Sequence, residues 1–297
     1  MINRNIYFTV FCVFLMSIAF QVYAERMEPV DAAKYCFDKN KPNILLTEKS
    51  TKGIVYKPDG HIYTTASVAI ASGLRPSRAF ALAYFSQYPD LDKDYDAVSV
   101  GIQYSYKPWQ WGWRNTVLAK LHSLHGEDHD GIKRRRSVLL KIISSLIGDP
   151  ALDWQTGLLI HSYGDSYAHT HTIYNYGTDK EEAYGPKLGH AWDSKYGVDP
   201  DKVKDPKIPQ YFDKFTDYIT TLFDNLRQPG ASEEHLTALL AYYNEMECDE
   251  LCPTYFEIMP TQESETNKEP LKNYMSCMLA NTRKITRKDI YTVTNRF

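Results

Sequence analysis

The chain has 297 residues, which is enough for one large domain or two small ones and for a substantial hydrophobic core. Aromatic residues make up 13% of the chain, and the sequence contains 23 tyrosines. The formal net charge of −3 excludes a molecule that binds polyanions through bulk electrostatic attraction.

The N-terminus has the pattern of a targeting segment. Arg4 supplies the positive charge, residues 6–20 are apolar, and Ala24 is a small residue at which signal peptidase could cleave. The apolar stretch is short for a membrane span, so a retained anchor is the weaker alternative. We therefore expect residues 1–24 to be a signal peptide and the mature protein to be a secreted or periplasmic bacterial protein.

Cleavage there would remove Cys12 and leave an even number of cysteines: Cys36, Cys248, Cys252 and Cys277. In an exported protein this count predicts two disulfides, with the pairing left open. The close pair Cys248 and Cys252 could also form half of a zinc site. Because no second closely spaced Cys/His pair accompanies it, disulfides are the preferred interpretation.

Apolar spacing and helix-end signals predict a mostly α-helical chain. The predicted helices cover residues 61–74, 76–89, 137–148, 211–226 and 232–246, and Pro89 helps to end the second of them. A further helix starts at Asp149 and Pro150 and carries the motif at 161–171. Residues 25–60, 91–115 and 176–209 are predicted to be irregular. We expect a single all-α domain over residues 25–297, with long loops on one side.

The motif HSYGDSYAHTH at 161–171 holds the main chemistry of the chain. His161, Asp165 and His169 are four residues apart, so they drift by only about 40° per step and share one helix face. A lone histidine is usually an ordinary hydrogen-bonded core residue. Burying three such groups in an apolar helix is costly without a partner ion, so the pattern indicates a metal site. His171 lies about 200° from His169 and is expected to face elsewhere unless the helix has ended before it.

Further side chains that can bind metals lie on both sides of this motif. They are His61, Asp90, Asp92, Asp94, His122, His125, Asp128, His129, His190 and Asp193. Each one alone is a weak signal, because exposed aspartates and loop histidines are common. Their number strengthens the case, since every histidine except His235 lies between 61 and 190.

Four stretches resemble the zinc-dependent phospholipase C family, which is related to the single-strand-specific zinc nucleases. Within that superfamily they are most similar to an uncharacterised bacterial branch. They are GHIYTTASVAIASGLRPSRAFALAYFSQYPD (60–90), LHSLHG (121–126), GLLIHSYGDSYAHTH (157–171) and GHAWDSKYGVDPDKV (189–203). They occur in the family's order and cover about half of the mature chain.

The resemblance implies an all-α domain with two or three zinc ions in a cleft. The ligands it implies are His61, Asp90, His122 or His125, His161, Asp165 as the bridging carboxylate, His169, His190 and, less directly, Asp193. Two features depart from the family. Asp193 follows His190 at i+3 instead of i+4, and the family's N-terminal tryptophan ligand has no counterpart before Trp109.

The reaction implied by the resemblance is phosphodiester hydrolysis, with Asp90 as the catalytic base. Phospholipid is the preferred substrate, and the slightly acidic chain weighs against a nucleic acid. Two alternatives stay open. The chain could be a zinc-dependent nuclease, or an exported metal-binding or interaction protein whose cluster only stabilises the fold.

Two other segments could contact a substrate or partner. Trp109, Trp111 and Trp113 alternate and would share one face of an extended loop, where they could enter a lipid interface, stack on bases or pack together. The run KRRR at 133–136 could meet phosphates, although a solvated helix start is the preferred interpretation.

Overall fold

The computed structural model describes residues 26–42, 60–171, 174–187, 189, 198–205, 207–245 and 265–297. The predicted signal peptide at 1–24 and four predicted residues, Cys248, Cys252, His190 and Asp193, lie outside the described residues. Among the helices that are described, none is long and apolar enough to cross a membrane.

The fold is all-α, as predicted. Its α-helices are α2 (Pro29–Asn40), α3 (Gly60–Ala71), α4 (Pro76–Leu91), α5 (Ala97–Gln103), α6 (Trp111–Asn115), α7 (His129–Leu146), α8 (Asp153–Ala168), α10 (Gln210–Leu226), α11 (Glu233–Glu245), α12 (Glu265–Asn281) and α13 (Arg287–Thr294). Three short turns of helix are η1 (Pro108–Gln110), η2 (Thr116–Leu121) and η3 (Pro150–Leu152). The strands β1 (Thr170–His171) and β2 (Glu182–Ala183) form one antiparallel pair.

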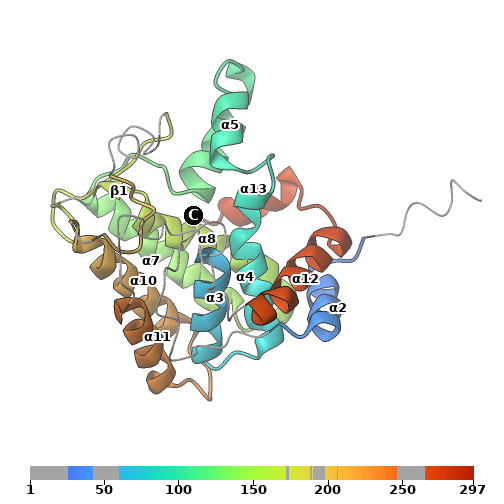
Figure 1. The fold of residues 1–297 in the computed structure, drawn as a ribbon. Coiled ribbons are helices and arrows are strands. Elements are labelled where there is room, and N and C mark those ends of the chain that lie inside the picture. Colours follow the sequence, from blue (N-terminus) through green and yellow to red (C-terminus); the bar gives the residue numbers. More distant parts are fainter. Residues whose placement is uncertain are drawn as a thin grey trace, which may run out of the picture.

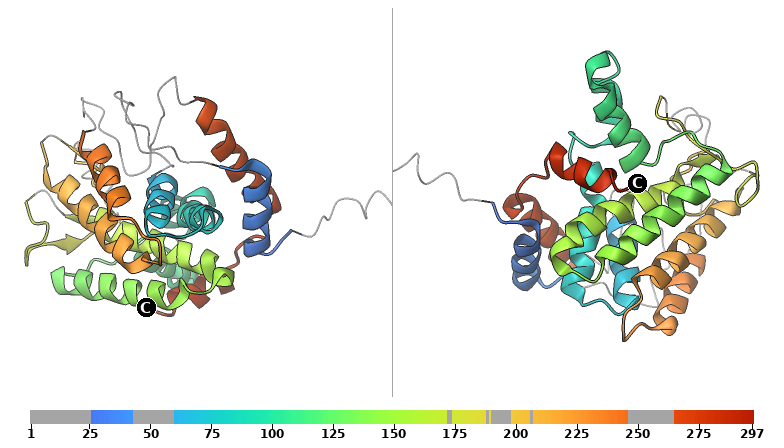
Figure 2. Two further views of the ribbon diagram at one scale, coloured as in Figure 1. Left: turned by 90° about the horizontal axis from the view of Figure 1, so that it is seen from below. Right: turned by 180° about the vertical axis from the view of Figure 1, so that it is seen from behind.

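The helices α3, α4 and α8 form the centre of the molecule, because α4 packs against both of the others. On one side lie α7, α10 and α11, and on the other lie α2 and α12 (Figures 1 and 2). The helix α5 projects away from this body (Figure 1). The histidine motif therefore sits on an inner helix.

Nearly every residue of α8 is buried, on all sides of the helix. Gly157 permits this, because an added Cβ would lie 2.6 Å from the Cβ of Phe85 and 2.7 Å from the carbonyl oxygen of Leu82. The missing side chain thus lets the backbones of α8 and α4 approach closely. Since α8 carries His161 and α4 carries Asp90, this contact also sets the distance between two predicted ligands.

The prediction of irregular structure at 25–60 was wrong for its first part, where α2 forms. Pro29 starts this helix at a position that needs no N–H, and Ala32, Ala33 and Cys36 form its buried side. Cys36 forms a disulfide with Cys277 of α12, across 241 residues of sequence. One of the two expected disulfides is therefore present.

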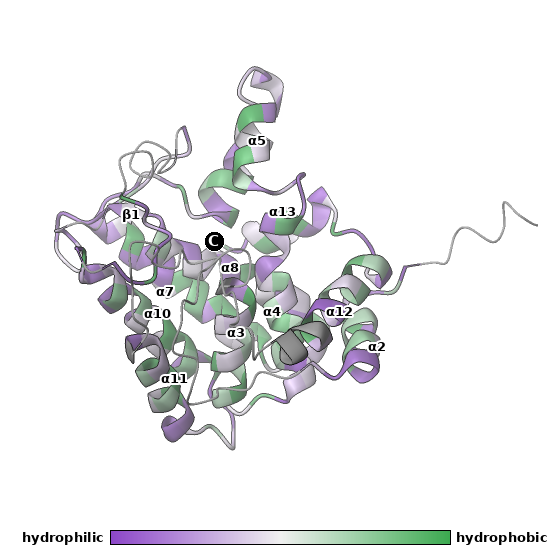
Figure 3. Cartoon of the chain, viewed as in Figure 1, coloured by the Kyte–Doolittle hydropathy of each residue, from purple (hydrophilic) through white to green (hydrophobic). Residues whose placement is uncertain are grey.

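Residues 91–115 also differ from their prediction, since α5, η1 and α6 form there. In this helical geometry the three tryptophans do not share a face: Trp113 is buried, whereas Trp109 and Trp111 are exposed. The turn that follows, η2, is a π-helix in which the N–H of His122 donates to the carbonyl of Val117. Figure 3 shows hydrophobic residues on the projecting α5 as well as in the body.

Two helix ends differ slightly from their predicted positions. Pro89 does not end α4, which continues to Leu91, so Asp90 lies in its last turn. The helix α7 starts at His129 and includes the whole KRRR run, of which Lys133 and Arg134 are exposed. Arg136 instead turns inward and donates to the carbonyl of Ser166. The run is therefore only partly a solvated face.

The contact at Gly157 predicts the effect of a single methyl group. Gly157→Ala should lower the free energy of unfolding by about 1–3 kcal/mol, because the added Cβ overlaps Phe85 and Leu82. Urea unfolding followed by circular dichroism measures this. Gly148→Ala is the matched control, since no atom lies within 4 Å of its added Cβ. Equal stability of the two variants would contradict the close α4–α8 contact.

Candidate metal centre

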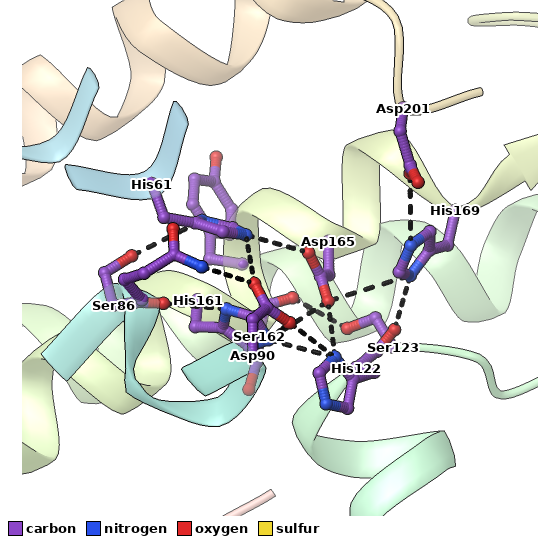
Figure 4. Close-up of polar contacts among 12 residues, drawn as sticks. His61, Ser86, Asp90, His122, Ser123, His161, Ser162, Asp165, His169 and Asp201 are labelled. Carbon is purple, nitrogen blue, oxygen red and sulfur yellow. Dashed lines mark hydrogen bonds and ion pairs between the residues drawn. The ribbon is translucent and has the colours of Figure 1, made fainter. Parts of the chain in front are cut away.

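Six predicted ligands from distant parts of the chain lie together (Figure 4), and all of them except His169 belong to groups that could hold a metal ion. They are His61 at the start of α3, Asp90 in the last turn of α4, His122 directly after η2, His161 and Asp165 on α8, and His169 at the end of α8. The sequence brings them together because α3, α4 and α8 pack side by side. All except Asp90 are buried.

Asp165 is the centre of the cluster, and its two oxygens face different imidazoles. Oδ2 lies 3.2 Å from His161 Nε2 and 3.2 Å from His122 Nδ1. Oδ1 lies 3.3 Å from His61 Nε2 and accepts no hydrogen bond from the described residues. Only 1% of this side chain is exposed, so the carboxylate depends on its neighbours and not on water.

Backbone carbonyls fix the orientation of the imidazoles. His161 Nδ1 lies 2.7 Å from the carbonyl of Ser86, and His122 Nε2 lies 2.9 Å from that of Tyr95. A carbonyl only accepts, so each of these nitrogens carries the ring proton. The opposite nitrogens, His161 Nε2 and His122 Nδ1, then present lone pairs, and they lie 3.0 Å apart. Metal-binding histidines typically donate their other ring N–H to a carbonyl in this way.

The geometry of these atoms fits one cation. Two imidazole lone pairs and one carboxylate oxygen form a triangle with sides of 3.0, 3.2 and 3.2 Å. Ligands of a tetrahedral ion with bonds of about 2.0–2.1 Å are separated by roughly 3.3 Å. A proton can serve one pair of these acceptors at a time, whereas a cation serves all three. The buried His/Asp groups could therefore hold a metal ion.

A second group shares members with the first. His61, His161 and Asp165 each offer an atom within 4.8 Å of the others, and so do Asp90, His122 and His161. Ser86 connects these groups, because its carbonyl orients His161 and its hydroxyl lies 3.4 Å from His61 Nδ1. The two groups share His161, so each offers an alternative position at which a cation could bind.

Asp90 lies at the edge of the cluster, with 23% of its side chain exposed. Its oxygens are 3.8 Å from His122 Nδ1 and 3.9 Å from His61 Nε2, farther than those of Asp165. The amide of Gln87 donates to Oδ2 over 3.0 Å and holds the carboxylate in place. Asp90 is therefore the carboxylate of the cluster that water can reach.

His169 faces another carboxylate that the sequence did not single out. Its Nδ1 lies 2.7 Å from the carbonyl of His122, and its Nε2 lies 3.4 Å from Asp201 Oδ1. Asp201 falls within the resembling stretch 189–203, but the stretch has no helical spacing that would mark it. Ser86 gave no sequence signal either, because it contributes through its backbone and hydroxyl.

Burial and mutual charge shift the pKa values of the cluster in opposite directions. Burial alone would raise the pKa of Asp165, but His161 and His169 hold it well below its ordinary value. Burial raises the pKa of Asp90 against the opposing effect of His161 and His122. For His169, burial acts downward, yet Asp165 and Asp201 raise the pKa to about 9. The two aspartates thus have distinct electrostatic roles.

Of the two histidines predicted as alternatives, only His122 lies in the cluster. The ring of His125 contacts Glu127, whose backbone N–H donates to His125 Nδ1 over 3.2 Å. Burial, with Arg135 and Arg136 nearby, lowers the pKa of His125 to about 3. His171 also lies apart. The helix α8 has ended before it, so its predicted helical angle does not apply, and its ring is tilted against that of Tyr184 with 3.8 Å between ring centres.

Comparison of the chain with protein-family models, with curated proteins and with solved structures found no match. The chemistry of the site is therefore inferred from its own geometry and from the sequence resemblance.

The separate positions of the two histidines predict different metal contents. His122→Gln should lower the amount of divalent metal that copurifies with the protein, because it removes a nitrogen 3.2 Å from Asp165. His125→Gln, the matched control, should retain the metal. Elemental analysis of both purified variants measures this. Equal metal loss in both would contradict the assignment of His122.

Proposed function

We propose that the protein is a zinc-dependent phosphodiester hydrolase, with phospholipid as its first candidate substrate. The observation that carries the proposal is a buried carboxylate, Asp165, facing imidazole nitrogens of His61, His122 and His161, beside a more exposed carboxylate, Asp90. Such a pair supplies one group that binds metal and one that can exchange protons with water.

Zinc is the preferred metal because of the donor atoms. The cluster offers imidazole nitrogens and carboxylate oxygens without thiolates, and zinc binds such mixed sets readily. His61, His122, His161 and Asp165 would hold the zinc. When bound, zinc would lower the pKa of a coordinated water and neutralise charge on the phosphate.

The residues of the chain would supply orientation and proton transfer. Asp90 is the candidate general base because it is exposed enough to reach water and is held by Gln87. The carbonyls of Ser86 and Tyr95 would keep His161 and His122 in the tautomers that leave their metal-facing nitrogens unprotonated.

Export is part of the proposal. The predicted signal peptide at 1–24 would direct the chain out of the cytoplasm, and the Cys36–Cys277 disulfide is stable in an oxidising compartment. A secreted or periplasmic enzyme would meet phospholipid at a membrane surface.

The depth of the cluster favours a second candidate function. His161 is 0% exposed and Asp165 is 1% exposed, which is typical of ions that stabilise a fold. In that case the protein is an exported metal-binding or interaction protein. Zinc would then raise the melting temperature without any phosphodiester turnover.

Replacement of the candidate base tests the proposal. The zinc-loaded protein should hydrolyse phosphatidylcholine, and Asp90→Asn should lower kcat by about 100-fold or more, because an amide cannot accept the proton. Release of the phosphorylated head group measures turnover, and single-stranded DNA serves as the competing substrate.

The matched control is Asp94→Asn, an exposed aspartate on the same segment that pairs with Lys284 outside the cluster. This control should keep full activity, since exposed ion pairs contribute little. Metal analysis of both variants separates loss of a base from loss of an ion. Activity of Asp90→Asn equal to that of the wild type would contradict the assignment, and DNA cleavage alone would favour the nuclease.

A further inference from the structure

We propose that residues 97–115, called the arm below, attach the protein to the surface of a phospholipid membrane. The arm contains α5, η1 and α6 and projects from the helical body (Figure 1). Among the described residues, five of the twelve exposed large apolar side chains belong to it, and they are 51–77% exposed. They are Val98, Ile102, Tyr106, Trp109 and Trp111. Exposed apolar side chains gathered in this way mark an interaction surface.

The helix α5 is apolar on two opposite sides. Val100 and Tyr104 are buried and hold it to the protein. Val98 and Ile102, also one turn apart, point the other way and are 68% and 66% exposed. A helix in water needs apolar residues on its inner side only. The outer pair therefore indicates an apolar surrounding on the far side of the arm.

The composition of the arm fits a lipid–water interface. Tryptophan and tyrosine are enriched there because their rings are apolar and carry one polar group. The sequence from 97 to 126 contains no aspartate or glutamate, and Lys107 and Arg114 give the arm a positive charge. The ammonium of Lys107 lies over the rings of Tyr104 and Tyr106, at 5.3 and 5.5 Å. This charge complements anionic phospholipid head groups.

The base of the arm is firmly held, so its outer side chains are presented by a rigid support. The buried ring of Trp113 packs edge-on against Tyr95 and Tyr291. The guanidinium of Arg287 lies 4.7 Å from the centre of the Trp113 ring and donates to the hydroxyl of Tyr104 over 2.7 Å. The exposure of Trp109 and Trp111 is therefore a property of the folded arm.

The chain on either side of the arm meets at the His/Asp cluster. Tyr95 precedes the arm and His122 follows it, and the carbonyl of Tyr95 accepts the Nε2–H of His122 over 2.9 Å. The arm therefore begins and ends close to the cluster in the chain. Membrane attachment through it would hold the cluster near the lipid surface, which deepens the proposed function without requiring turnover.

Vesicle sedimentation tests the attachment. The mature chain, residues 25–297, in an Asp90→Asn background should sediment with vesicles of phosphatidylcholine and phosphatidylglycerol. Trp109→Ser with Trp111→Ser should lower its partition coefficient about tenfold or more, because two apolar rings are lost from the interface. The Asp90→Asn background keeps binding separate from hydrolysis, so either proposal can fail alone.

The matched control replaces two equally exposed apolar residues elsewhere, Tyr174→Ser with Leu279→Ser, and should bind as the parent does. Thermal melting of all variants verifies folding. Three results would overturn the proposal: no sedimentation of the parent, equal loss in the control, or binding of single-stranded DNA through Trp109 and Trp111 in place of vesicles.

Discussion

The structure depends on one buried negative charge, the carboxylate of Asp165. A charge at 1% exposure is costly unless opposite or polar groups surround it, and the chain supplies imidazoles on both of its oxygens. Each of these imidazoles comes from a different element. The requirement to satisfy Asp165 therefore constrains where α3 begins, how closely α4 approaches α8, and where the chain returns after the arm.

The supporting contacts are mostly backbone contacts. Ser86 and Tyr95 contribute carbonyl oxygens, and Gly157 contributes the absence of a side chain. Ser123, directly after His122, adopts a left-handed backbone conformation with φ of 51° and donates to the carbonyl of Ser162 over 2.7 Å. This bond ties the residue next to a cluster histidine to α8. The cluster is thus built as much by chain geometry as by its titratable side chains.

The sequence predicted what local spacing determines. The pattern of His161, Asp165 and His169 follows the helical repeat, and the structure places His161 and Asp165 in groups that could hold a metal ion. His169 follows the last residue of α8, and its Nδ1 lies 3.7 Å from Asp165 Oδ2. Asp201 and Ser86 escaped prediction because their roles depend on contacts between elements far apart in the chain. A single sequence does not encode such contacts as a periodic signal.

The errors in the fold have related causes. Residues 91–115 contain Pro and Gly, which are turn signals and concealed short helices. The assumption of an extended loop then placed Trp113 on the same face as Trp109 and Trp111, although it is buried. The helix α2 is stabilised by the disulfide between its Cys36 and Cys277 of α12. The sequence left the pairing of the cysteines open, so it did not predict this constraint on α2. Tertiary contacts decided the conformation in both places.

The π-helical turn η2 widens the backbone directly before a histidine of the cluster. Its hydrogen bond, from the N–H of His122 to the carbonyl of Val117, spans one residue more than an ordinary helical hydrogen bond. A wide turn of this kind takes in an additional residue while the chain on either side keeps nearly the same direction. The segment that leads from the arm to His122 therefore carries one more side chain than a regular turn would, without a change in the direction of the imidazole.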